Sequence, residues 1–143
     1  MRSTARWVRD HLSVVDNGRE HAVVLDLPPG KNGSDLGATA LELSLMALSG
    51  CLSTIYTVVA ARMRLSLESL EVVLDAEKPE DAPAITRVQG TIQVTSPEEE
   101  KKLQRCLELT LDGCPVGKMF QQAGVELELE LVASEEQPAS VGV

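Results

Sequence analysis

The chain has 143 residues, 43% of them hydrophobic, which is enough for one domain with its own hydrophobic core. Its formal net charge of −9 repels a phosphate backbone, and its aromatic residues, Trp7, Tyr56 and Phe120, are too few to form a base-stacking platform. Composition and charge therefore argue against nucleic-acid binding.

The N-terminal residues and the cysteines bear on location. Residues 1–15 contain Arg2, Arg6 and Arg9 but no continuous apolar segment, so we expect no signal peptide. The three cysteines are an odd number and lack the spacing of a secreted disulfide framework. We therefore expect a protein of the reducing cytoplasm.

Three short strands are predicted at the start of the chain. They span residues 4–9, 12–15 and 22–27. Asp16, Asn17 and Gly18 lie between the second and third strands and predict a hairpin turn, because Asn and Gly tolerate positive φ. Residues 28–30, Pro-Pro-Gly, end the third strand, and residues 31–37 predict a loop rich in Gly, Asn and Ser.

A long helix is predicted after this loop. Thr39, with Glu42 three residues later, matches a capping box at its start. Residues 43–61 carry no charge, and the helix is expected to end near Arg62. This stretch approaches the length of a membrane span, but Ser, Thr and Gly residues interrupt it and the sequence has no second apolar span. We therefore predict a buried helix of a soluble protein and no membrane association.

The same helix bears on the oligomeric state. A helix that is apolar nearly all round must be covered on every side. A chain of this length with one sheet can hardly supply that cover alone. We therefore expect a homodimer in which two such helices pack together.

The second half of the chain alternates strands and helices. Strands are predicted over residues 70–77, 85–95 and 125–131, and helices over residues 96–113 and 115–123. The first of these helices should begin with Ser96 as N-cap, Pro97 at the first helical position and Glu99 at the third. Its inward stripe is Leu103, Leu107 and Leu111.

The order of elements is three strands, a long helix, two strands, two helices and a final strand. Strands joined by hairpins, with the helices segregated from them, define an α+β fold. We predict a single domain over residues 1–132. Residues 133–143 form a polar tail, which we expect to be disordered.

Cys114 lies between Gly113 and Pro115. Proline at a first helical position would make Cys114 the N-cap, where free backbone N–H groups and the helix dipole stabilise a thiolate. The alternative is a small, buried, unreactive residue at a turn.

Cys51 and Cys106 fall inside predicted helices. A thiol in the middle of a helix gains nothing from the helix dipole, and burial among apolar residues should raise the pKa of Cys51. Such a residue is a core cysteine unless a cation is brought to it from elsewhere. Cys106 adjoins the apolar stripe of its own helix and is predicted to lie in the core or on a partly exposed helix face, without a reactive role.

The chain carries no sequence motif for a metal or a nucleotide cofactor. His11 and His21 lie in the N-terminal strands without the ligand spacing of a zinc site. Glycine-rich phosphate loops and the nucleophile motif of the α/β-hydrolases are absent from the sequence. We therefore predict no metal and no cofactor.

Two motifs resemble those of the OsmC/Ohr family. Residues 37–51, GATALELSLMALSGC, resemble the family stretch G-x-[ST/N]-P-x-E-L-x-L-x-A-L-x-x-C. Residues 114–116, Cys-Pro-Val, resemble its second motif, C-P-V, and residues 84–87 resemble the strand between the two motifs. The similarity extends to about Leu131, and the two motifs in this order are more specific than either alone.

The resemblance implies an OsmC-like fold, with antiparallel sheets, a long buried central helix and an intertwined homodimer whose active sites lie at the subunit interface. It implies a peroxidase for organic hydroperoxides in which Cys51 is oxidised to a sulfenic acid and Cys114 condenses with it to a disulfide. A dithiol, typically lipoyl-bound, then reduces that disulfide. In the family an arginine lies over the first cysteine; Arg19 is our first choice for it and Arg9 the alternative.

The sequence departs from the family pattern at two positions. Peroxidases of this type have a glutamate ten residues before the first cysteine, to hold the arginine, where this chain has Leu41; the family proline is replaced by Ala40. Glu42 lies nine residues before Cys51, which puts it on roughly the opposite side of a continuous helix. A second interpretation therefore stays open: a stress-associated binding or redox-sensing protein with this fold and no peroxidase activity.

Overall fold

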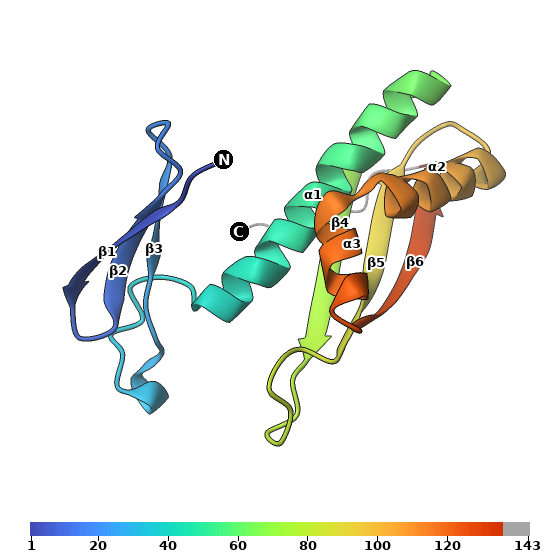
Figure 1. Ribbon diagram of the computed structural model, residues 1–143. Coiled ribbons are helices and arrows are strands. Elements are labelled where there is room, and N and C mark those ends of the chain that lie inside the picture. Colours follow the sequence, from blue (N-terminus) through green and yellow to red (C-terminus); the bar gives the residue numbers. More distant parts are fainter. Residues whose placement is uncertain (136–143) are drawn as a thin grey trace. The chain divides into compact units, whose positions relative to one another are not determined.

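The structure, a computed structural model, describes residues 1–135 of the chain (Figure 1). It confirms the α+β class and the predicted order of elements. The chain divides into two compact units, Met1–Met46 and Ala47–Val143. Helix α1 (Ala40–Met63) begins in the first unit and continues into the second.

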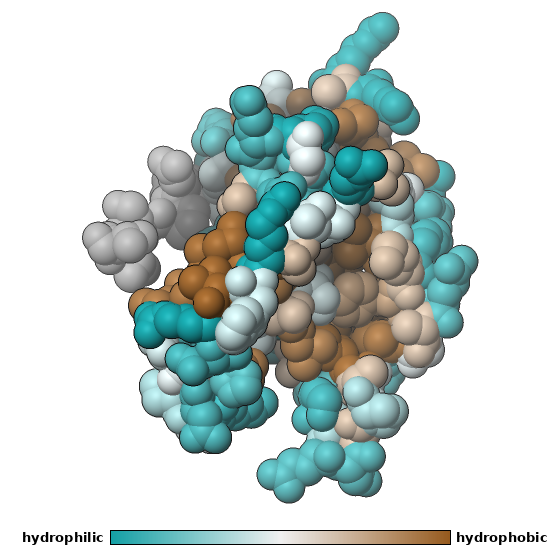
Figure 2. Space-filling model, turned by 60° about the vertical axis from the view of Figure 1, so that its left-hand side comes forward, coloured by the Kyte–Doolittle hydropathy of each residue, from teal (hydrophilic) through white to brown (hydrophobic). Residues whose placement is uncertain are grey.

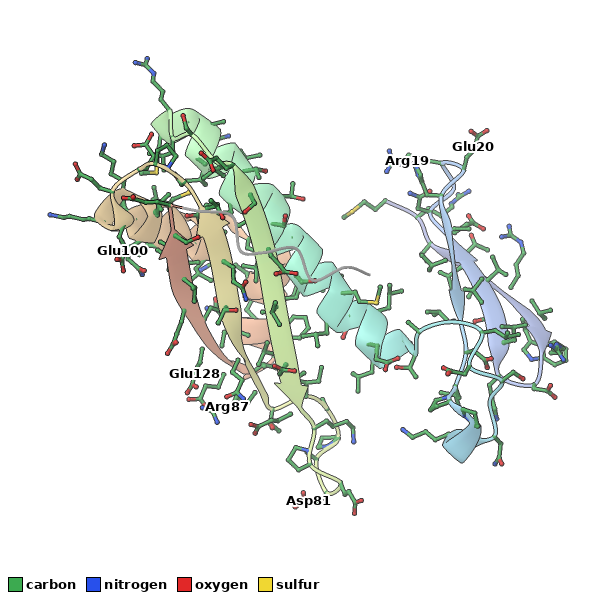
Figure 3. All side chains as sticks on the ribbon, turned by 180° about the vertical axis from the view of Figure 1, so that it is seen from behind. Arg19, Glu20, Asp81, Arg87, Glu100 and Glu128 are labelled. Atoms are coloured by element: carbon green, nitrogen blue, oxygen red, sulfur yellow. The ribbon has the colours of Figure 1, made fainter. Side chains whose placement is uncertain are left out.

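The first unit contains a three-stranded antiparallel sheet. Its strands are β1 (Thr4–Arg9), β2 (Leu12–Asp16) and β3 (Ala22–Leu25), in that order across the sheet. The predicted turn after β2 is in place, in a loop of residues 17–21 across which Asp16 pairs with Ala22. Gly18 adopts the positive φ of 72° that its type favours, and Arg19 lies at the tip of this loop (Figure 3).

The loop after β3 is built around Asp26, which is only 3% exposed. Its carboxylate accepts three backbone hydrogen bonds, from Leu27 at 2.8 Å, Ser34 at 3.1 Å and Leu36 at 3.2 Å. Burial alone would raise the pKa of Asp26, yet these N–H groups together hold it below its ordinary value. Residues 26–27 were predicted to belong to the strand and Asp26 to have no role, whereas the Asp26 side chain organises the loop.

Helix α1 starts at the predicted capping box, where Thr39 and Glu42 hydrogen-bond each other. Its buried face consists of Leu48, Leu52, Tyr56, Val59 and Ala60. Other apolar residues of the helix, such as Met46 and Val58, are exposed, in agreement with the expectation that one chain cannot cover this helix alone. Apolar side chains, brown in Figure 2, accordingly form part of the surface.

Helix α1 is also long and apolar enough to cross a membrane, by length and composition only. It is the one such helix among residues 1–135. The core helix of a soluble protein passes the same test, so this finding leaves the prediction of a soluble protein as it was.

The sheet of the second unit has the order β4-β5-β6. These strands are β4 (Ser69–Glu77), β5 (Arg87–Thr95) and β6 (Glu126–Ser134). β4 and β5 are antiparallel, but β6 runs parallel to β5. The expectation of antiparallel sheets is wrong for this pair, because α2 (Glu100–Gly113) and α3 (Pro115–Gln122) form a helical crossover between the two strands.

The helices of this unit cover one face of the sheet (Figure 1). Val88, Ile92 and Val94 from β5 form a core with Leu103 and Leu107 from α2. The opposite face carries charge, and Figure 3 shows Arg87 beside Glu128, with which it forms an ion pair across β5 and β6.

Two predicted boundaries were wrong. Helix α2 begins at Glu100 instead of directly after Ser96, because the Ser96 backbone N–H still bonds to Ser134 O at 3.0 Å and holds the residue extended. For the same reason β6 continues to Ser134, beyond the predicted domain end at residue 132. Of the predicted disordered tail, residues 136–143 lie outside the described part of the chain.

Candidate active site: a pair of thiols

Cys51 lies in the middle of α1 and is half-buried. In helical phase it falls between the buried face of α1 and the exposed side that includes Gly50. A Cβ built on Gly50 would meet no atom within 4 Å, so the surface beside Cys51 is open in the single chain. The expectation that Cys51 is an enclosed core residue is therefore only half right.

Cys114 occupies the break between α2 and α3 and is the N-cap of α3, as predicted from Pro115. Its Sγ accepts a hydrogen bond from the Gly117 backbone N–H at 3.3 Å. The residue has an exposed fraction of 0%. Gly117 lies against Cys114 and near Leu48 of α1, since a Cβ added at Gly117 would lie 3.4 Å from Cys114 Sγ and 3.9 Å from Leu48 Cδ1.

The two sulfur atoms are in contact. Cys114 Sγ–H donates to Cys51 Sγ over 2.9 Å, although 63 residues separate them in the sequence. A disulfide bond is about 2.05 Å long, so the two residues are present as free thiols. A small movement of either side chain would bring the sulfurs to bonding distance.

The predicted acidity of Cys114 is wrong for this dithiol state. Burial and the hydrogen bond to Cys51 raise its pKa to about 11, against the opposing effect of the Gly117 N–H. The prediction considered only the free N–H groups at the start of α3, which lower the pKa of Cys114. It left out the burial of Cys114, which raises this pKa by more.

Cys106 is structural, as predicted. It is fully buried on α2, its Sγ–H donates to the Tyr56 carbonyl at 3.6 Å, and burial raises its pKa. The Tyr56 hydroxyl in turn donates to the Leu103 carbonyl at 3.1 Å. These two hydrogen bonds join α1 to α2 in the core.

The other predicted site residues belong to the first unit. Arg19 is exposed at the hairpin tip, where its backbone N–H donates to Asn17 Oδ1 at 2.8 Å. Arg9, the alternative, is the last residue of β1 and is also exposed. A role for either beside Cys51 stays a prediction. Leu41 is 44% exposed on α1.

Gly117 is a member of the site that the sequence analysis missed. It stands at the third position of α3, the place from which a backbone N–H reaches the N-cap side chain. The signal was available in the sequence as a glycine three residues after Cys114. Among residues 1–135, no group of three or more His, Cys, Asp or Glu side chains is arranged to hold a metal ion.

Comparison with known proteins gives a consistent result. The family described as OsmC-like protein matches residues 31–130. An OsmC-like protein from Mycoplasma pneumoniae superposes with a TM-score of 0.83 at 14% identity, covering 92% of this chain and 95% of that one.

Two further structures carry more specific names. An organic hydroperoxide resistance protein OsmC from Legionella pneumophila has a TM-score of 0.70 at 15% identity, over 92% of this chain and 96% of that one. An organic hydroperoxide resistance protein from Elizabethkingia anophelis has a TM-score of 0.71 at 14% identity, over 92% and 94%. At these identities the likeness shows the fold alone. A comparison with curated proteins gave no match.

Proposed function

The chain belongs to the OsmC-like protein family, and from this premise we propose that it is a thiol-dependent peroxidase that reduces organic hydroperoxides with Cys51 and Cys114. The observation that carries the proposal is the 2.9 Å contact between the two sulfurs. A sulfenic acid formed on one of them would meet the other thiol at once. We further propose that it acts in the cytoplasm, where thiol reductants keep the pair reduced.

The exposure of the two thiols supports giving the first step to Cys51. A hydroperoxide must reach the attacking sulfur, and Cys51 is half-buried whereas Cys114 is 0% exposed. The Cys51 thiolate attacks one peroxide oxygen, the O–O bond breaks, and the alkoxide leaves and takes up a proton to become an alcohol. Cys51 is left as a sulfenic acid.

In the second step, Cys51 and Cys114 form a disulfide. Cys114 Sγ attacks Cys51 Sγ, the S–O bond breaks, and hydroxide leaves as water with the proton of the Cys114 thiol. The product is a Cys51–Cys114 disulfide, and a dithiol of the lipoyl type would return it to two thiols. Because burial raises the pKa of Cys114, proton transfer from this thiol must accompany its attack.

Activation of Cys51 requires a cation, and we assign that role to Arg19 with Arg9 as the alternative. An arginine beside a thiol favours the thiolate. In this chain the carboxylate that would orient such an arginine is replaced by Leu41, and Glu42 is engaged in the capping box with Thr39. We therefore propose a slower peroxidase than relatives that have the glutamate.

We propose that the protein works as a homodimer in which α1 packs against its copy. Five small exposed residues follow a three-four spacing along α1, the repeat that brings two helices together: Ala47, Gly50, Thr54, Thr57 and Ala61. The Thr54 and Thr57 hydroxyls donate to carbonyl groups of their own helix, so they need no partner across such a contact. We call these five residues the α1 seam. Measured around the helix axis, Cys51 lies roughly 80° from the centre of the seam, at its margin.

A second function is favoured by the same departure from the family pattern, Leu41 at the position of the glutamate. Without a held arginine the pair could serve as a redox sensor or belong to a stress-associated binding protein, with slow oxidation and no turnover. The fold accommodates either function, so the rate of the first step decides between them.

Peroxide turnover with a lipoyl dithiol tests the proposal. tert-Butyl hydroperoxide and hydrogen peroxide are supplied with dihydrolipoamide, and peroxide loss is followed for the wild type and three variants. Cys51→Ser should abolish turnover, Cys114→Ser should allow one turnover and then accumulate sulfenic or sulfinic acid at Cys51, and the matched control Cys106→Ser should retain activity. A wild type that consumes no organic hydroperoxide under these conditions would leave the sensing or binding function as the better description.

A further inference from the structure

We infer that the thiol that reduces the Cys51–Cys114 disulfide attacks Sγ of Cys51, and that Cys114 departs as a thiolate held by the Gly117 backbone N–H. The inference rests on the proposed function, since it concerns the disulfide which that reaction would produce. It assigns Gly117 as a positioning residue and makes α1, not α3, the element on which the reductant arrives.

Access is the first argument. An incoming thiolate approaches a disulfide in line with the S–S bond, so the rate depends on which sulfur can be reached. Cys114 is 0% exposed, and the Gly117 backbone lies against its sulfur. Cys51 is half-buried and lies at the margin of the proposed α1 dimer contact, away from Gly50 near its centre. Attack on Cys51 requires no displacement of α3, whereas attack on Cys114 does.

The leaving group is the second argument. When Cys51 is attacked, the departing sulfur is Cys114, and it departs into hydrogen bonds that already exist. The Gly117 N–H lies 3.3 Å from Cys114 Sγ, and the N–H groups of Gly117 and Val116 both act to lower the pKa of this thiol. If Cys114 were attacked, Cys51 would leave from the middle of a helix, where the backbone N–H groups are bonded within the helix.

The state of the pair changes which interactions remain. In the dithiol, the Cys114 thiol donates to Cys51, and that contact is one of the causes of its raised pKa. Once Cys51 carries the incoming thiol, this contact is lost while the Gly117 N–H stays in place. Burial still disfavours the Cys114 thiolate, so its departure should depend strongly on the Gly117 N–H.

The electrons balance with a dithiol as the reductant. Its first thiolate forms a bond to Cys51 Sγ while the Cys51–Cys114 bond breaks, and the electron pair of that bond goes to Cys114 Sγ. Its second thiolate then displaces Cys51. The dithiol becomes a disulfide, and the two protons that it loses equal the two that Cys51 and Cys114 take up.

Trapping the mixed disulfide tests the site of attack. The Cys106→Ser protein, which has only the pair, is oxidised with diamide so that the test does not depend on peroxide chemistry. It is then mixed briefly with 2-mercaptoethanol, quenched in acid, alkylated and mapped by peptide mass spectrometry. We expect mercaptoethanol on Cys51 and the alkyl group on Cys114. Mercaptoethanol on Cys114, or no disulfide after diamide, would overturn the inference.

A pair of variants tests the role of Gly117. Gly117→Pro removes the N–H, which the first turn of the helix does not need, whereas Gly117→Ala keeps it and adds a Cβ at ordinary contact distances. We expect Gly117→Pro to slow reduction of the diamide-made disulfide by about threefold to tenfold and Gly117→Ala by less than about twofold. Thiol titration of Cys114 in a Cys51→Ser background should show a higher pKa for Gly117→Pro alone.

The outcomes separate the two proposals. If the diamide-made disulfide is reduced through Cys51 but organic hydroperoxide is not consumed, the peroxidase proposal fails and the inference on the direction of exchange stands. If turnover is normal but the adduct forms on Cys114, the peroxidase proposal stands and the inference fails. Equal reduction rates in Gly117→Pro and Gly117→Ala would show that the Gly117 N–H does not assist the departure of Cys114.

Discussion

Thr39 and Glu42 hydrogen-bond each other in both directions across the first turn of α1. The Glu42 N–H donates to Thr39 Oγ1 at 3.2 Å, and the Thr39 N–H donates to Glu42 Oε2 at 2.7 Å, which lowers the pKa of Glu42. The one carboxylate near the family's glutamate position is therefore committed to starting the helix. To orient an arginine, Glu42 would first have to give up its hydrogen bond to Thr39.

The first prediction follows from this commitment. Leu41→Glu places a carboxylate ten residues before Cys51, and we expect turnover of organic hydroperoxide to rise about tenfold, because an arginine held over Cys51 favours its thiolate. Glu42→Gln should lower the thermal midpoint of unfolding slightly and leave turnover unchanged. A Glu42→Gln protein that keeps its stability but loses activity would show that Glu42, not a residue at position 41, holds the arginine.

The second prediction concerns the pairing of the cysteines. One equivalent of organic hydroperoxide should produce a Cys51–Cys114 disulfide and leave Cys106 reduced, because the first two sulfurs are in contact and Cys106 donates to Tyr56 in the core. Peptide mapping under non-reducing conditions measures this. A bridge that includes Cys106 would contradict the pairing.

The third prediction concerns the dimer. Sedimentation of the wild type at micromolar concentration should give about twice the chain mass of 15.4 kDa. Gly50→Leu should give a folded monomer, because the added side chain meets open space in the single chain but blocks the approach of a second helix. Gln104→Leu places the same side chain at an exposed position of α2 and is the matched control. A monomeric wild type, or a dimeric Gly50→Leu protein, would argue against the seam on α1.

The fourth prediction is a pH dependence of stability from Asp26. Because its pKa is lowered in the folded protein, its contribution is complete above the unfolded value of about 3.9 and is lost as the pH falls through the lower folded value. Urea midpoints of the wild type and of Asp26→Asn should therefore differ at neutral pH and converge in acid. A gap that is the same at pH 7 and at about pH 3 would show that the charge of Asp26 contributes nothing.

The fifth prediction tests the close approach of β4 and β5. A Cβ on Gly90 would lie 2.0 Å from the Val73 carbonyl oxygen, so Gly90→Ala must push the strands apart. We expect a loss of about 2–3 kcal/mol in the free energy of unfolding, measured by urea denaturation. Gly30→Ala, where the added methyl group meets no atom within 4 Å, should change it by less than about 1 kcal/mol.

Local signals in the sequence predicted local structure well. The capping box at Thr39 and the N-cap position of Cys114 are both where the sequence placed them, because each depends on residues within one helical turn. The start of α2 was wrong because Ser96 is held by Ser134, a partner far away in the sequence. The direction of β6 was wrong for a related reason, since strand pairing is decided by the crossover and not by the alternation within the strand.

The site was predictable in identity but not in its chemistry. Cys51 and Cys114 were chosen through the resemblance of two motifs, and periodicity alone could not have paired residues so far apart. The acidity of Cys114 could not be predicted, because the burial that opposes its helix N-terminus comes from α1. Asp26 was missed because a single Asp before a Pro-rich loop has no pattern to mark it.

The helical crossover also governs when the thiol pair comes into existence. During synthesis Cys51 leaves the ribosome well before Cys114, and β6, which is needed to hold the crossover against the sheet, follows later still. Pairing of β6 with β5 is a non-local event and therefore a slow one. Until it is complete, Cys51, Cys106 and Cys114 are three separate thiols that an oxidant can join in any combination. Selective formation of the Cys51–Cys114 disulfide thus requires a chain that has finished folding, so oxidation produces wrong pairings in newly made copies of this protein more than in mature ones.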